Sequence, residues 1–201
     1  MIRIVTALAA LVLLGGCSDW TYQRTATGKL KGTLMVKWLS QDQFVFLPDA
    51  QDPLTFTRAG NEVITPKEMF TDGGTIPPAL RAIKAYSPWG YAPAFIVHDW
   101  LFVMHHCKLP GHENYDLEKA ATVMAEAIKT MMEDPKFGGP NKLALYTMYE
   151  GVRSQKAREY WDNGSCDTPG GKRSIVPQDE MRAMRDFRTD TSLPSFVIKL
   201  P

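Results

Sequence analysis

The sequence has little excess charge of either sign and lacks a second long apolar run. It holds 23 Lys and Arg against 22 Asp and Glu, for a formal net charge of +1. This balance removes the electrostatic basis for binding nucleic acid or for holding a membrane through a polybasic patch. Beyond the first 16 residues no apolar run reaches 18 residues, which excludes a second membrane span. The 15 Gly and 14 Pro are scattered without a period, which excludes collagen-like and low-complexity chains.

What remains is the composition of a folded domain. The chain has 201 residues, of which 44% are hydrophobic and 22% charged. That length fits one ordinary domain, and that composition can form a buried core. We expect a single globular domain over residues 33–161, followed by a polar C-terminal extension over 162–201.

The N-terminus has the pattern of an export signal. Arg3 precedes an unbroken small or apolar run over Ile4–Leu14, which is too short to span a membrane. The next residues, Gly15-Gly16-Cys17, complete a pattern that resembles the bacterial lipoprotein signal, in which cleavage before the cysteine leaves a lipid-bearing N-terminus. This resemblance implies a signal peptide over 1–16 and lipidation of Cys17. The polar composition of the residues that follow, rich in Gly, Thr and Lys, predicts a tether over 17–32. The alternative is an ordinary secretory signal with an incidental cysteine.

The same resemblance predicts where the protein resides. Lipoproteins of this type carry more than one acyl chain, palmitate among them, and two or more chains hold a protein stably on a membrane. Ser18 after the cysteine is similar to the context that sorts such proteins to the outer membrane, facing the periplasm. We therefore expect the protein to contact the membrane through its N-terminal lipid and not to bind nucleic acid. The sequence does not identify a protein partner.

Two cysteines remain once Cys17 is acylated. Cys107 and Cys166 would sit in an exported compartment, which permits disulfides. A bridge between them would close a loop of about 60 residues and stabilise the fold by roughly 4 kcal/mol on the chain-entropy model. The alternative is two separate thiols.

Residue patterns predict an α+β fold. Short runs rich in Val, Phe and Trp over 33–39 and 44–47, and a hairpin-like turn at Arg58–Asn61, predict three or four antiparallel strands in an N-terminal meander. A last strand is predicted at Phe196–Ile198. We expect this meander to pack on a bundle of about three to four helices.

The helical signal begins after Pro77. A short helix is predicted from Pro78 to about residue 86, and another at 178–188. Longer helices are predicted over 91–107, over 116–133 with Asp116 as N-cap, and over 141–161. The second of these carries an apolar stripe at i, i+3 and i+4 spacing, made of Leu117, Ala120, Ala121, Met124, Ile128 and Met131.

Two segments carry residues capable of chemistry. The first is the run Phe70–Pro78 (FTDGGTIPP), whose glycines can adopt positive φ and expose backbone N–H groups; its candidate binding residues are Asp72, Gly73, Gly74 and Thr75. The second is the His98-Asp99 step inside an apolar helix, where a buried carboxylate needs a donor, a cation or a metal. Each also has a purely structural interpretation. The glycine run can be a turn that connects two elements, and His98 can be a core histidine whose ring is hydrogen-bonded within the fold.

The four histidines offer a further alternative. All of them fall between His98 and His112, and Cys107 lies among them. Imidazole and thiolate are ligands for Zn²⁺, although the spacing matches no established zinc motif. A disulfide at Cys107 would remove it from any such site.

These segments resemble a known family. The turn FTDGGTIPP, then about twenty residues, then Pro93-Ala94-x-x-x-His98-Asp99-x-Leu101-Phe102, is similar to the domain-of-unknown-function family 1353 of bacteria and tailed phages. The resemblance covers roughly residues 33–130. It implies an architecture and no agreed activity.

A looser resemblance implies a mechanism. A histidine-aspartate helix preceded by a glycine-rich loop is similar to the core of phospholipases A2. Carried over, His98 would be the general base, Asp99 a Ca²⁺ ligand, and Gly73 and Gly74 carbonyl donors. The position of the orienting aspartate in those enzymes is held here by Ala121, so that Asp116 or Glu118 would have to take its role.

These resemblances leave two main hypotheses. In the first, the chain is an envelope lipoprotein, non-catalytic or phage-derived, in which the His-Asp step and the TDGGT turn hold the fold. His98 and Asp99 would then be buried and would pair with the turn, for example with Thr71, Thr75 or backbone N–H groups. In the second, it is a metal-assisted ester hydrolase that acts on phospholipid-like substrates, with His98 as base and Asp99 as metal ligand. A third interpretation, a lipoprotein that binds a toxin or phage protein, would be favoured by exposed aromatics among Trp20, Trp89, Tyr91 and Trp161.

Overall fold

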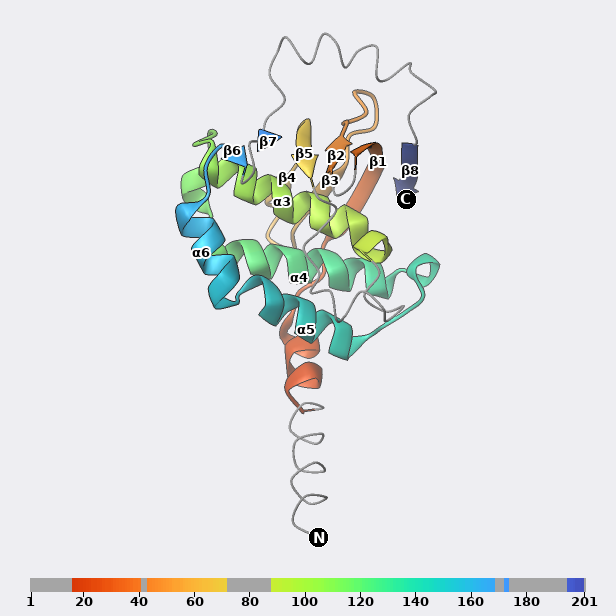
Figure 1. The fold of residues 1–201 in the computed structure, drawn as a ribbon. Helices are drawn as coiled ribbons and strands as arrows, with labels where there is room; N and C mark the ends of the chain where they lie inside the picture. Colours follow the sequence, from red (N-terminus) through yellow and green to blue (C-terminus); the bar gives the residue numbers. More distant parts are fainter. Residues whose placement is uncertain (1–15, 41–42, 72–87, 169–171, 174–194, 201) are drawn as a thin grey trace.

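The computed structural model of the chain has helices packed on a curved antiparallel sheet (Figure 1). This α+β architecture, with an N-terminal meander and a helical layer, confirms the predicted fold class. The residues that the structure describes are 16–40, 43–71, 88–168, 172–173 and 195–200. The helices predicted near 78–86 and 178–188 lie outside these residues.

One long strand organises the sheet. Strand β1 pairs antiparallel with β2, β3 and β8, while β4 extends from β3 and β5 from β2. The strand bounds are β1 Lys29–Ser40, β2 Gln43–Phe46, β3 Thr55–Thr57, β4 Val63–Ile64, β5 Met69–Thr71 and β8 Ser195–Leu200. A separate small hairpin consists of β6 Asp167–Thr168 and β7 Lys172–Arg173.

Gly32 lies where β1 changes partners. Lys29 to Lys31 pair with β3, and from Gly32 onward the strand pairs with β8. Gly32 has φ +98°, and a Cβ there would lie 2.1 Å from the carbonyl oxygen of Pro53. Glycine therefore suits this position for two reasons: it adopts positive φ without strain, and it has no Cβ to clash with the neighbouring chain.

The helices form a layer on the sheet. Helix α4 lies between α3 and α5 and also contacts β1 (Figure 1). Every residue of its predicted apolar stripe is buried, and Asp116 accepts a hydrogen bond from Lys119 N as its N-cap, as predicted. The helix bounds are α3 Ala92–His106, α4 Leu117–Glu133, α5 Lys142–Val152 and α6 Gln155–Asn163, with 3₁₀ turns at Pro88–Tyr91, His112–Asn114 and Pro135–Phe137.

Two segments differ from the sequence-based expectation, and a third contains a predicted strand. Residues 16–24 form a helix, although a tether was expected from residue 17, and the rest of the expected tether leads directly into β1. The helix predicted over 141–161 is two helices, because Ser154 caps α6 by accepting a hydrogen bond from Ala157 N. The strand predicted at Phe196–Ile198 is present as β8, and it pairs with β1, so the end of the expected C-terminal extension belongs to the sheet.

A charge cluster ties the β3–β4 turn to α4. Arg58 forms a two-pronged pair with Glu126, with distances of 2.6 Å (Nε–Oε2) and 2.9 Å (Nη2–Oε1), and a third nitrogen lies 2.8 Å from Glu62. Lys119 Nζ lies 3.2 Å from Glu62, and the Tyr115 hydroxyl also hydrogen-bonds it. The hydrogen bond to Glu126 raises the pKa of Arg58. Burial raises the pKa of Glu62, but the bonds from Tyr115, Arg58 and Lys119 outweigh it, so its net pKa is lowered.

Among the described residues, no helix is both long enough and apolar enough to cross a membrane.

Candidate functional site

Helix α3 positions the His-Asp step in the interior of the domain. Pro93 stands in its first turn, where the missing N–H costs nothing, and the helix ends at His106. It is apolar on nearly every side, which is the pattern of a buried helix. Its buried residues are Ala92, Pro93, Ala94, Phe95, Ile96, Val97, His98, Trp100, Leu101 and Val103. The two polar side chains of the step are therefore held on a rigid, enclosed element.

Asp99 is held by the strand that leads into the glycine turn. The hydroxyl of Thr71, the last residue of β5, donates to Asp99 Oδ2 at 2.7 Å. Thr71 is buried, whereas the Asp99 side chain is 25% exposed. The structure thus joins the start of the FTDGGTIPP run to the His-Asp helix. The candidate binding residues Asp72, Gly73, Gly74 and Thr75 lie outside the described residues.

His98 is enclosed, and one of its ring nitrogens has no hydrogen-bond partner within the described part of the chain. The residue is 8% exposed, and Nε2 is buried. Nδ1 lies 3.8 Å from Asp99 Oδ1, which is beyond hydrogen-bond reach. The ring packs on Phe102 with centroids 4.9 Å apart. Buried polar atoms are nearly always hydrogen-bonded, so this nitrogen is the unusual feature of the site.

The other histidines of α3 hold α6 in place. His105 stacks on Trp161 with ring centroids 4.1 Å apart. His106 Nε2 lies 3.1 Å and 3.2 Å from the carbonyl oxygens of Tyr160 and Trp161, to which it donates. Burial lowers the pKa of both imidazoles below the ordinary value. These contacts are those of neutral rings that pack α3 against α6.

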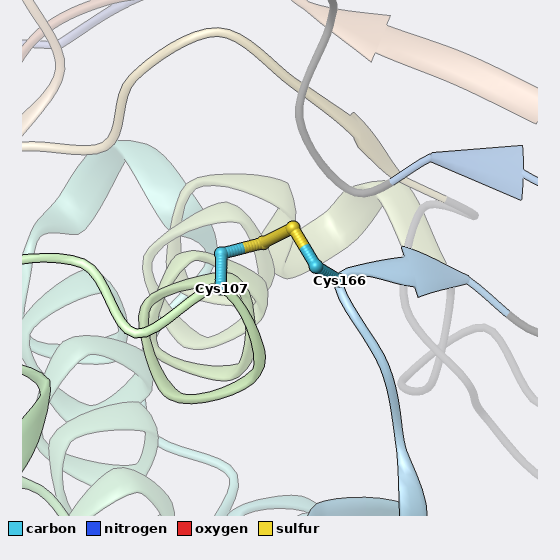
Figure 2. The surroundings of a disulfide bond; sticks show 2 residues. All are labelled: Cys107 and Cys166. Atoms are coloured by element: carbon cyan, nitrogen blue, oxygen red, sulfur yellow. A yellow bond between two sulfur atoms is a disulfide. The ribbon is translucent and has the colours of Figure 1, made fainter.

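A disulfide fixes the same end of α3. Cys107 and Cys166 are bonded, with Cα atoms 4.6 Å apart and a sequence separation of 59 (Figure 2). Of the two alternatives for these cysteines, the structure contains the bridge. Cys107 is therefore not available as a zinc ligand, and Cys17 is a free, exposed thiol.

The carboxylates at the start of α4 are engaged away from His98. Asp116 caps its own helix. Glu118 pairs with Arg153 at 2.5 Å and with Arg158 at 3.2 Å, which connects α4 to the α5–α6 corner. Ala121 is fully buried. Neither acidic side chain takes the role of an orienting partner for the imidazole.

The described residues do not assemble a calcium site. Ca²⁺ takes six to eight oxygen ligands. In the part of the chain that the structure describes, no group of three or more His, Cys, Asp or Glu could hold a metal ion. Asp99 contributes a single carboxylate, and one of its oxygens already accepts the Thr71 hydroxyl. The other proposed ligands, Gly73 and Gly74, lie outside the described residues.

The partner of Asp99 was among those that the sequence offered. If the His-Asp step holds the fold, the sequence predicts that it pairs with Thr71, Thr75 or backbone N–H groups of the turn, and the structure contains the Thr71–Asp99 bond. Thr75 lies outside the described residues. Among the aromatics considered as a binding surface, Trp20 is 61% exposed, whereas Tyr91 and Trp161 are buried. The exposed aromatic lies in the N-terminal helix, far along the sequence from the His-Asp step.

Comparisons of the chain with protein-family models, with curated proteins and with solved structures found no match.

Proposed function

We propose that this chain is a lipid-anchored module of the bacterial envelope, similar to the domain-of-unknown-function family 1353, in which the His-Asp step is a structural tie. The observation that carries the structural role is the Thr71–Asp99 hydrogen bond, which joins β5 to α3 at 2.7 Å. A neutral donor bonded to a carboxylate satisfies that partly buried group without any substrate. The enclosure of His98 supports the same role.

The anchor rests on the N-terminal pattern and on the state of the cysteines. The export run ends at Cys17, and the disulfide uses the other two cysteines of the chain. Cys17 is exposed, so its sulfur is accessible for acylation. With a formal charge near zero, the protein would stay at the membrane through its acyl chains, each worth about 0.8 kcal/mol per buried CH₂. We place it at the outer membrane, facing the periplasm, on the basis of Ser18.

The structural tie is tested by removing either half of it. Asp99→Asn and Thr71→Val should each lower the free energy of unfolding by about 1–2 kcal/mol, the range for a hydrogen bond to a charged group that is partly exposed. The double variant should cost little more than Thr71→Val alone, because Asp99→Asn takes the charge from the same contact that Thr71→Val removes. Asp116→Asn is the matched control, since Asn caps a helix as well as Asp does. Melting curves that Asp99→Asn leaves unchanged would reject the structural role.

The His98 nitrogen that has no hydrogen-bond partner among the described residues favours one alternative, an ester hydrolase. An imidazole can remove a proton from an attacking water if its free nitrogen reaches that water and its pKa is near neutral. Nε2 is the nitrogen that would take this role, with Asp99 beside Nδ1. The hydrolase hypothesis thus assigns a role to His98 Nε2, which the structural role does not explain.

The hydrolase is tested directly on the purified mature protein. It should hydrolyse a phospholipid or a simple acyl ester, with the rate measured in added Ca²⁺ and in chelator, and His98→Ala should abolish that rate. His112→Ala is the control, because this ring lies in a surface 3₁₀ turn and is 29% exposed. A rate that survives His98→Ala would eliminate the hydrolase hypothesis.

A further inference from the structure

The folded domain begins immediately after the cysteine that we propose is lipidated. Residues 16–24 are helical, and Ser18, Thr21 and Tyr22 are buried against the domain. Ser18 is the residue next to Cys17, so no flexible residue separates the sulfur from packed structure. The 17–32 stretch therefore cannot act as the spacer that its polar composition predicted.

Several contacts fix this helix to the rest of the domain. The Tyr22 hydroxyl donates to Glu133 at 2.6 Å, at the end of α4. Lys129 donates to the carbonyl oxygens of Tyr22 and Thr25, at 2.8 Å and 2.9 Å, and so satisfies the last turn of the helix. Asp19 pairs with Lys142 at the start of α5. The helix is thereby tied to two others, and its direction relative to the domain is set.

The outer face of the helix carries side chains suited to a membrane surface. Cys17, Trp20 and Arg24 follow one another at i, i+3 and i+7, and all three are exposed. Trp20 is 61% exposed, and the Arg24 guanidinium lies 4.8 Å from its ring centroid. Indole rings are enriched at the level of lipid headgroups, and guanidinium groups bind phosphate.

We propose that this surface, made of Cys17, Trp20 and Arg24 and called here the anchor face, rests in the headgroup layer of the bilayer and sets the orientation of the domain. The inference rests on the proposed lipidation of Cys17. Trp20 is three residues from Cys17, a helical rise of about 4.5 Å. The headgroup layer is roughly 5–8 Å thick on each side of a bilayer, so the indole lies within it. In Figure 1 this helix projects from the end of the domain opposite the β2–β5 edge of the sheet.

The experiment uses the lipidated protein in vesicles of phosphatidylethanolamine and phosphatidylglycerol whose acyl chains are brominated near the headgroup. Bromine quenches only tryptophans that lie in the membrane. Trp20 is one of five tryptophans, so the wild type should lose up to about one-fifth of its emission relative to unbrominated vesicles. Trp20→Phe should lose none. Trp38→Phe is the matched control, because Trp38 is also exposed but lies on β1, roughly 30 Å beyond Lys29 at the rise of a strand.

A second variant tests the direct junction. Ten Gly and Ser residues inserted between Cys17 and Ser18 keep the lipid and all three side chains of the anchor face but release the domain, so the quenching should fall to the Trp20→Phe level. Two results would overturn the anchor face and leave the lipoprotein proposal intact. One is equal quenching of tryptophan emission with and without the insertion. The other is acylated, vesicle-bound wild type whose emission is quenched no more than that of Trp20→Phe. If mass spectrometry shows that the mature protein carries no acyl chains, both the anchor face and the lipoprotein proposal are overturned.

Discussion

The pair between Arg58 and Glu126 connects the β3–β4 turn to the centre of α4, and we expect its loss to destabilise the domain substantially. Glu126→Gln keeps the size and shape of the side chain but removes its charge. The Glu126 side chain is 8% exposed and that of Arg58 is 18% exposed, so little solvent screens the pair. The substitution leaves a cation whose two-pronged partner has become neutral.

The magnitude follows from burial and from the remaining partner. Breaking a buried ion pair from one side costs about 3–5 kcal/mol. Arg58 keeps Glu62 as a second carboxylate, at 2.8 Å, which offsets part of that cost. We therefore expect the free energy of unfolding to fall by about 2–3 kcal/mol, which for a chain of this size lowers the melting temperature by roughly 4–12 °C.

Denaturant titration followed by circular dichroism measures this loss as a change in midpoint at constant slope. Glu62→Gln is the matched control: its side chain is 31% exposed, and we expect a change below about 1 kcal/mol. Arg58→Met with Glu126→Leu should recover most of the loss, because an apolar pair replaces the buried charges. If Glu126→Gln costs no more than Glu62→Gln, the reasoning from burial is refuted.

Three further predictions concern the α3–α6 contact. Replacing both Cys107 and Cys166 by Ser should cost about 4 kcal/mol in denaturant unfolding, because the bridge closes a long loop in the unfolded chain; a loss below 1 kcal/mol would contradict this. Gly164→Ala should lower the free energy of unfolding by about 1–3 kcal/mol in the same measurement, because a Cβ there would lie 2.2 Å from the His106 ring. Gly151→Ala, in α5 with open space around it, should instead raise that free energy by about 0.5–1 kcal/mol. Burial lowers the pKa of His106, so the unfolded state binds the proton more readily, and stability should be lost as pH falls through 6.5 toward the folded pKa. Melting temperatures at pH 7.5 and pH 5 should show this fall in wild type and a smaller one in His106→Gln; an equal fall in both proteins would reject the assignment.

Local signals predicted most of the fold. The apolar stripe and the cap of α4 are contained in a few neighbouring residues, so periodicity alone identified them. Ser154 offered a similar signal for the start of α6, but helix-forming residues on both sides of it masked the break. The N-terminal helix gave no such signal, because its buried face includes the polar residues Ser18 and Thr21.

The candidate site was predictable in outline only. The order of the glycine run and the His-Asp step indicated that the two lie close, and the Thr71–Asp99 bond joins the residue at the start of that run to the helix. Which of Thr71, Thr75 and the backbone N–H groups makes the contact could not be told from the sequence, because it depends on where β5 ends, and that is set by its pairing with β2. The buried nitrogen of His98, which has no partner among the described residues, depends on packing from several elements, which no local pattern encodes.

The pairing of β1 with β8 has a consequence for the order in which this protein can be made. Gly32 pairs with Leu200 and Lys37 with Ser195, so the first strand of the sheet waits for a strand that follows every described helix in the sequence. A nascent chain that has emerged only as far as α6 still has an open backbone edge along β1, and contacts so distant in sequence form slowly. The sheet is therefore completed only after the helical layer has been synthesised.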